Sequence, residues 1–133
     1  MIIIEKVALA YIRDKKVLMA RSRKNKEVFY TLGGKIEEGE TDVECLVREV
    51  REEVGTDLET SSLTYVDTLE AKAHDKPDTV VRVKLYTGDL IGTPTASSEV
   101  EEITFFDSSM NKKYRSALTE KALDSLKAKG YIR

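Results

Sequence analysis

The sequence predicts an α/β fold in which a mixed β-sheet lies between helices. Segments with alternating or β-branched apolar residues recur along the chain, an amphipathic helical segment lies among them, and a second helical segment follows the last of them. Because strands come before, between and after the two helices, we expect helices to cover the sheet. The 133 residues are expected to form one domain, residues 1–133.

The first third of the chain predicts a β-hairpin and a short third strand. Residues 5–12 and 17–22 have strand composition, and the polar segment 13–16 between them predicts a turn. Residues 29–32 predict a strand that leads directly into the glycine pair at positions 33 and 34.

A helix from Asp42 to Val54 is predicted by signals at both of its ends. Thr41 and Glu44 have the spacing of a capping box, and Gly55 follows the last periodic residue, where a left-handed cap is commonly glycine. The apolar stripe is expected to comprise Val43, Val47, Val50 and Val54, with Leu46 at its margin. Cys45, beside this stripe, is expected to be a shielded, unreactive thiol.

The rest of the chain predicts three more strands and a C-terminal helix. Residues 63–73 and 80–90 have strand composition and are joined by the turn-forming segment 75–78. Residues 101–106 predict a short strand, and residues 121–129 lie in a helix that is expected to stop at Gly130. The only histidine, His74, is expected at the surface or at the edge of the substrate site.

Three glutamates of the first helix are expected to point the same way. Glu52 lies roughly 60° to one side of Glu49 and Glu53 roughly 40° to the other, so the three fall within an arc of about 100°. Like charges at these spacings repel one another, and their hard oxygen atoms suit Mg or Mn. Most acidic helix faces are only solvated surface. The glycines at 33 and 34 favour a site here, because bare backbone can approach a metal or a phosphate closely.

The segment from Gly34 to Thr56, GKIEEGETDVECLVREVREEVGT, resembles the signature of the Nudix hydrolases. That signature is a glycine, five residues, a glutamate, seven residues, and then Arg-Glu-apolar-any-Glu-Glu-any-Gly-apolar. The positions that match it are Gly34, Glu40, Arg48, Glu49, Val50, Glu52, Glu53 and Gly55. Thr56 stands where an aliphatic residue is usual, a departure that concerns local packing more than chemistry.

The resemblance implies a Nudix-type α/β/α sandwich and the divalent-metal-dependent hydrolysis of a pyrophosphate bond, with Mg as the metal and Mn as a possible substitute. It implies that Glu52 and Glu53 are the principal metal ligands and that Glu49 is a further ligand or the general base. Arg48 would orient a glutamate, Glu40 and Gly34 would support the site, and the carbonyl of Gly33 or Gly34 is a candidate extra ligand. The base itself stays open among Glu49 and three downstream acids, Glu99, Glu101 and Glu102, of which Glu99 is also a possible extra ligand.

Substrate contacts must come from outside the acidic helix. Arg21, Arg23 and Lys35 could form a cationic rim for a phosphate, and we expect Lys35 and Arg23 to bind substrate. Phe29 and Tyr30 could stack on a base, although aromatic residues that enter a strand more often belong to the core.

The expected substrate is a small nucleotide. A nucleoside triphosphate, in the manner of MutT-like housecleaning members, is favoured over ADP-ribose or a nucleotide sugar, because ADP-ribose-cleaving members commonly carry an extra N-terminal region and this chain starts almost directly with its first strand. A catalytically inactive nucleotide-sensing or protein-binding domain is the alternative from another class. It is less favoured because Glu49, Glu52 and Glu53 are all present.

Composition limits the partners. With 22 basic and 24 acidic residues the net charge is −2, which argues against binding long nucleic acids. No segment has the ~20 apolar residues that span a bilayer, so no membrane partner and a cytoplasmic location are expected. The single cysteine cannot form an internal disulfide, which suits a reducing compartment. The sequence does not distinguish a monomer from a homodimer.

Overall fold

Within residues 1–73 and 76–133, the part of the chain that this computed structural model describes, seven strands form one mixed sheet. The order along the sheet is β2-β3-β4-β1-β6-β5, and β7 pairs with β3. The strands are β1 Ile2–Ala10, β2 Ile12–Arg13, β3 Lys16–Ser22, β4 Tyr30–Lys35, β5 Asp57–Lys72, β6 Thr79–Ile91 and β7 Val100–Phe106. β1 and β6 are parallel, whereas the other pairs are antiparallel. His74 and the first residue of the expected turn at 75–78 lie outside the described residues.

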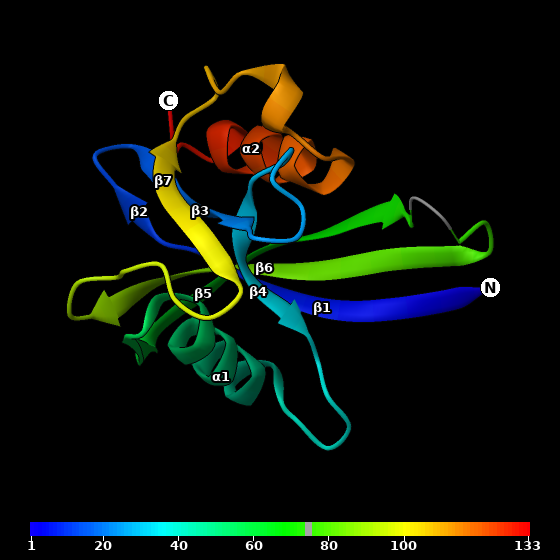
Figure 1. Cartoon of the computed structure of the whole chain (residues 1–133), viewed down its shortest axis with the longest axis horizontal. Coiled ribbons are helices and arrows are strands. Elements are labelled where there is room, and N and C mark those ends of the chain that lie inside the picture. Colours follow the sequence, from blue (N-terminus) through cyan, green and yellow to red (C-terminus); the bar gives the residue numbers. More distant parts are fainter. Residues whose placement is uncertain (74–75) are drawn as a thin grey trace.

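Two helices cover opposite sides of this sheet. Helix α1 spans Asp42–Val54 and helix α2 spans Ala117–Ala128, with a short 3₁₀ helix, η1, at Lys112–Tyr114 before it. Figure 1 shows α1 on one side of the sheet and α2 on the other. The predicted α/β/α sandwich with a mixed sheet between helices is therefore confirmed. In the described ranges neither helix is long and apolar enough to cross a membrane.

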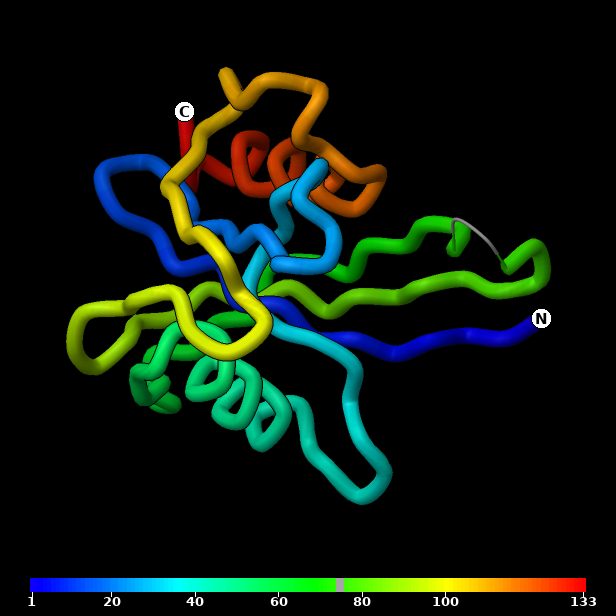
Figure 2. The backbone as a smooth tube through the Cα atoms, viewed as in Figure 1, coloured from blue at the N-terminus to red at the C-terminus, as the bar shows by residue number. Residues whose placement is uncertain are grey.

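The alternation of side chains along β1 divides the core into two clusters. Ala8 and Ala10 belong to the cluster beneath α2, whereas Val7 and Leu9 belong to the cluster beneath α1. Successive side chains of a strand point to opposite faces, so this one strand supplies both layers. In the backbone view of Figure 2, the N-terminal end of β1 runs beside the extended β5–β6 hairpin.

Several strands extend beyond the residues that the sequence predicted. β1 begins at Ile2 rather than residue 5, and β5 begins at Asp57 rather than residue 63, because register shifts let it keep pairing with β6 through its polar first half. β4 continues through both glycines to Lys35 and pairs with β1 there. Turns and caps agree better with prediction: the segment 13–16 is a turn, and Gly130 follows α2 with φ +82°.

The buried face of α1 differs from the predicted stripe. Cys45, Leu46, Val50 and Val54 are the buried residues, whereas Val43 is 41% exposed. Val43 and Leu46 lie three residues apart, so they are neighbours on the helix surface. A rotation of the helix about its own axis is therefore enough to bury Leu46 in place of Val43. The predicted cap is confirmed in both directions, because the Glu44 amide donates to Thr41 Oγ1 at 3.1 Å and the Thr41 amide donates to Glu44 Oε1 at 3.0 Å.

Thr56 carries an unpaired polar atom into the core. The residue is 8% exposed, and its Oγ1 has no hydrogen-bond partner among the residues that the structure describes. The departure from an aliphatic residue at this position therefore costs the desolvation of a hydroxyl group without a compensating bond.

We predict that Thr56→Val raises the free energy of unfolding by about 1 kcal/mol, since it removes the unpaired hydroxyl and keeps the β-branched shape. Thr119→Val is the matched control, because Thr119 is also buried but donates to the Phe29 carbonyl at 2.6 Å. That variant should lose about 1–3 kcal/mol. Urea unfolding of both variants measures this, and a loss of stability in Thr56→Val would contradict it.

Candidate active site

The site is built where the backbone of β4 meets α1. The Gly33 amide donates to Glu53 Oε1 at 2.9 Å. A Cβ atom at Gly34 would lie 2.6 Å from Glu49 Oε1, and one at Gly33 would lie 2.1 Å from the Val7 carbonyl oxygen. Any side chain here would overlap a carboxylate or the neighbouring strand, and Gly33 also has φ +129°. The two glycines therefore let the strand come into direct contact with the glutamates.

Arg48 joins the three segments that surround these carboxylates. It binds Glu40 in a two-pronged ion pair, with Nε 2.7 Å from Oε2 and Nη2 2.9 Å from Oε1. Its Nη1 donates to Glu49 Oε1 at 2.8 Å, and Nη2 donates to the Lys35 carbonyl at 3.3 Å. A guanidinium group fits such a fork of acceptors better than an ammonium group does. Arg48 thus fixes loop, helix and strand relative to one another.

The pKa values of the carboxyl groups diverge according to their surroundings. The hydrogen bonds from Arg48 hold the pKa of Glu40 at about 2. Burial, with the charges of Glu49 and Glu52 as further causes, raises the pKa of Glu53 to about 8, against the lowering effect of the Gly33 amide. Burial also raises the pKa of Glu49. The surroundings therefore favour the neutral form of Glu53 and the charged form of Glu40.

The donor set fits a divalent cation. Glu40, Glu49, Glu52 and Glu53 supply four carboxylates, and in the described part of the chain Arg48 is the cation that pairs with the first three of them. Hard oxygen donors with an excess of negative charge suit Mg and Mn. No three acidic, histidine or cysteine side chains within residues 1–73 and 76–133 converge on one point as they stand. Glu53 is turned to the Gly33 amide and Glu49 to Arg48.

The loop that contains Thr95 and Ser97 caps the C-terminal end of α1. The amides of Thr95 and Ser97 donate to the carbonyls of Val54 and Glu53 at 3.0 Å each, and Ser97 Oγ donates to the Glu52 carbonyl at 2.7 Å. These bonds satisfy carbonyls that a helix end leaves without intrahelical partners. These contacts could not be predicted from the sequence, since Thr95 and Ser97 are distant from the helix in the chain.

The three downstream acids, Glu99, Glu101 and Glu102, lie just before β7 and within it, and their surroundings differ. Glu102 pairs with Arg21 and Glu101 lies 3.1 Å from Lys26, whereas Glu99 is exposed. The Arg23 amide donates to the Glu99 carbonyl at 2.9 Å. Glu99 also contributes to the raised pKa of Tyr30, after burial and Glu53. Among the three candidates, Glu99 is therefore the acid without an ion-pair partner in residues 1–73 and 76–133.

The proposed cationic rim is only partly assembled. Arg21 is directed to Glu102 and stacks on the Phe29 ring, so it is not available at the rim. Arg23 is exposed, and its Nε donates to the Ser98 carbonyl at 3.1 Å. Lys35 is exposed at the end of β4, directly after the glycines. The structure therefore leaves Lys35 as the more available of the two preferred residues.

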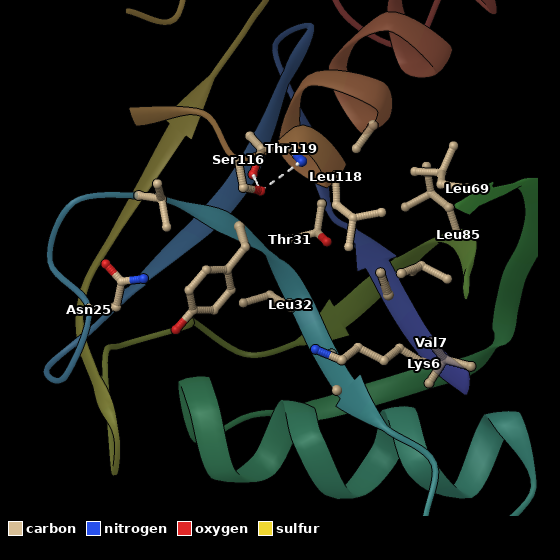
Figure 3. Close-up of a pocket in the computed structure, with 17 residues that line it drawn as sticks. Lys6, Val7, Asn25, Thr31, Leu32, Leu69, Leu85, Ser116, Leu118 and Thr119 are labelled. Carbon is tan, nitrogen blue, oxygen red and sulfur yellow. Dashed lines mark hydrogen bonds between the residues drawn. The ribbon is translucent and has the colours of Figure 1, made fainter. Parts of the chain in front are cut away.

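A cleft of about 290 Å³ lies on the α2 side of the sheet. Figure 3 shows side chains of the sheet and of α2 surrounding it. The apolar lining includes Leu69, Val83, Leu85, Leu118 and Ala122, and the polar lining includes Lys6, Asn25, Thr31, Ser116 and Thr119. Tyr30 also lines the cleft, whereas Phe29 is 3% exposed within the core. Sequence reasoning missed this cleft, apart from the possible base contact of Tyr30.

The cleft and the acidic cluster share the glycine pair. Gly33 and Gly34 line the cleft, and the same two residues contact Glu53 and Glu49. The cleft and the carboxylates therefore adjoin at a part of the strand that has no side chains.

Cys45 is enclosed beside the site. Its Sγ lies 3.7 Å from the Gly34 carbonyl and 3.5 Å from the Lys35 carbonyl. Burial, with Glu40 as the next cause, raises the pKa of this thiol to about 12. The thiol stays neutral, as expected for a packing residue.

Comparison with known proteins identifies the class of this chain. The NUDIX domain family model matches residues 4–123, so the chain belongs to the Nudix family, whose members are pyrophosphohydrolases that generally use divalent metals. The MutT NUDIX hydrolase of Burkholderia pseudomallei superposes with a TM-score of 0.80 at 18% identity, covering 95% of this chain and 99% of that one, which shows the shared fold.

Two relatives share part of the sequence. The dihydroneopterin triphosphate diphosphatase of Escherichia coli strain K12 is 37% identical over 62 residues, which are 46% of this chain and 41% of that protein. The NAD-capped RNA hydrolase of Pseudomonas aeruginosa is 49% identical over 55 residues, which are 41% of this chain and 19% of that protein. The match thus spans less than half the length of each of these relatives.

We predict that Gly33→Ala and Gly34→Ala fail in different ways. The Gly33 variant forces a Cβ against the β1 backbone at a positive φ, so it should lose several kcal/mol of stability, about 3 or more. The Gly34 variant meets only the movable end of Glu49, so it should stay folded but bind Mn²⁺ about tenfold more weakly. Thermal unfolding and electron paramagnetic resonance titration with Mn²⁺ measure the two effects. Unchanged Mn²⁺ affinity in folded Gly34→Ala would contradict the contact.

The raised pKa of Glu53 predicts how stability depends on pH without metal. Between the ordinary carboxyl pKa of 4.5 and the folded value of about 8, the folded state holds a proton that the unfolded state has released. Stability of the metal-free protein should therefore fall as pH rises through this window. Glu53→Gln stays neutral, so its melting temperature should fall less between pH 5 and pH 8. Parallel slopes for the two proteins in a chelator-treated sample would contradict the prediction.

Proposed function

We propose that this chain is a single Nudix hydrolase domain, residues 1–133, that hydrolyses a pyrophosphate bond in a nucleoside diphosphate-linked substrate. We propose Mg as its metal and a nucleoside triphosphate as its preferred substrate, in the manner of MutT-like housecleaning enzymes. The observation that carries the proposal is the glycine pair that lines the cleft on one side and contacts Glu49 and Glu53 on the other. The enzyme would act on small molecules, in the cytoplasm.

Glu52 and Glu53 would hold the metal, with Glu49 and the Gly33 carbonyl as further ligands. A bound divalent cation lowers the pKa of water and offsets charge on phosphate oxygens. Arg48 holds Glu49 from one side, and Glu40 in turn holds Arg48, so these residues position the carboxylate rather than react. Either Glu49 or the exposed Glu99 would accept the proton of the attacking water.

The cleft supports a substrate with one nucleoside-sized group. A volume of about 290 Å³ is near the lower end of small-molecule sites, which begin at roughly 300 Å³. Its apolar walls suit the faces of a base. Thr31 and the Asn25 amide can hydrogen-bond the base edge. Among the described residues the Asn25 side chain bonds only through Oδ1, which accepts from the Glu27 amide at 3.2 Å.

Relatives favour a triphosphate within this class. The name of the Escherichia coli relative specifies a triphosphate from which a diphosphate is released. ADP-ribose and nucleotide sugars place a second sugar beyond the cleaved bond and are the nearest alternatives. A domain without activity that senses nucleotides or binds proteins is the alternative from a different class.

The test is turnover of a substrate panel with Mg²⁺ or Mn²⁺. The panel contains nucleoside triphosphates, oxidised purine nucleotides, dihydroneopterin triphosphate, ADP-ribose, nucleotide sugars and dinucleoside polyphosphates, with products separated by chromatography. We predict that triphosphates yield a nucleoside monophosphate and pyrophosphate, and that Glu52→Gln and Glu53→Gln each lower kcat at least about 100-fold.

Glu38→Gln is the matched control, since Glu38 is exposed in the same glutamate-rich region and outside the site. It should keep wild-type kcat. Absence of turnover with every substrate and metal, or equal turnover by wild type and the Glu52 and Glu53 variants, would overturn the catalytic proposal. Preferred cleavage of ADP-ribose or a nucleotide sugar would replace the triphosphate proposal alone.

A further inference from the structure

Lys6 is a charged residue in a central strand at the cleft. It lies on β1, between β4 and β6, and lines the cleft. Its neighbour across β6 is Val83, a member of the apolar cluster beneath α2. Figure 3 shows the Lys6 side chain extended from β1 toward β4. An apolar residue would extend the core at this point, so the ammonium group needs another explanation.

Lys6 faces a second lysine. In the antiparallel pairing of β1 with β4, Lys6 is directly opposite Lys35. Directly opposed residues of such a pair lie on the same face, and like charges in this arrangement destabilise a sheet. The two lysines therefore carry an unfavourable interaction in the protein alone.

Three cations of the sheet have acidic partners. Arg82 pairs with Glu5 and Glu70, Lys84 with Asp42, and Arg21 with Glu102. Within residues 1–73 and 76–133, neither Lys6 nor Lys35 has a carboxylate within 4.0 Å. An anionic ligand would remove the repulsion between these two ammonium groups and gain a charge-assisted hydrogen bond from each.

The position of the two lysines indicates which kind of anion they would bind. Lys35 follows Gly34 in β4, and Lys6 lines the cleft together with both glycines. The glutamates contact those glycines from the α1 side, so positive and negative groups lie on opposite faces of one bare strand. A polyphosphate that leaves the cleft beside the glycines passes the lysines as it approaches the acidic cluster.

We propose that Lys6, together with Lys35, binds a phosphate group of the substrate at the cleft, which makes Lys6 a further substrate-binding residue. The proposal rests on the proposed function for its substrate. The phosphate is either the one kept on the nucleotide or one that leaves as pyrophosphate.

The kinetic test compares Lys6→Gln, Lys6→Arg and the control Lys127→Gln, which removes an exposed lysine of α2. Loss of a charge-assisted hydrogen bond should raise KM about tenfold in Lys6→Gln with kcat within about twofold. Lys6→Arg should recover part of the affinity, and Lys127→Gln should match wild type. KM in Lys6→Gln equal to that of Lys127→Gln would overturn the proposal.

Product inhibition distinguishes the two sources of phosphate. A higher inhibition constant for inorganic pyrophosphate in Lys6→Gln assigns the contact to the leaving group, and a higher constant for the nucleoside monophosphate assigns it to the retained phosphate. No change in either constant overturns the proposal. Thermal unfolding monitors folding, and Lys6→Gln should melt no lower than wild type because it removes a like-charge repulsion.

Calorimetry separates failure of this proposal from failure of the proposed function. Binding of inorganic pyrophosphate and of a nucleoside monophosphate is measured without turnover for wild type and Lys6→Gln. If wild type hydrolyses no nucleotide, the proposed function fails, and the role of Lys6 is decided by these titrations alone. A Kd about tenfold higher in Lys6→Gln for either ligand supports the contact, and equal Kd values for both overturn it.

Discussion

The direct contact between the backbone of β4 and the carboxylates of α1 is the constraint on which the rest of this structure depends. Two adjacent residues without side chains bring the strand within hydrogen-bonding distance of Glu53 and against Glu49. The same closeness places the thiol of Cys45 and the guanidinium of Arg48 on the carbonyls that end the strand. Side chains at these two positions would hold the helix away from the sheet and move all of these groups apart.

That contact also explains the electrostatics of the cluster. Carboxylates held against a sheet are shielded from water, which is the first cause of the raised pKa of Glu53 and Glu49. Arg48 offsets part of this charge, and its pairing with Glu40 fixes it in place. A group of acids that is costly for the protein alone is suited to receive a cation, because binding a cation removes the cost.

The sequence predicted best what short-range chemistry determines. The ends of α1 follow from Thr41, Glu44 and Gly55, whose hydrogen bonds lie within a few residues. The spacing of the glutamates and glycines identified the family and the place where they meet. The sequence did not determine which of Val43 and Leu46 is buried, because both fit the apolar periodicity of the helix. Packing against the sheet buries Leu46 and leaves Val43 exposed. Other features depend on contacts between distant segments, which no local pattern reveals. Strand pairing brings Arg21 to Glu102 and Lys6 opposite Lys35, and a loop brings the amides of Thr95 and Ser97 to the end of α1.

The division of the sheet into two faces has an evolutionary consequence. Residues that line the cleft come from β1, β4, β5, β6 and α2, whereas Glu49, Glu52 and Glu53 come from α1, and the two sets adjoin at the glycine pair. Substitutions among the wall residues can accumulate without moving a carboxylate, so lineages that share this scaffold are free to diverge in what they recognise while inheriting the same acidic helix.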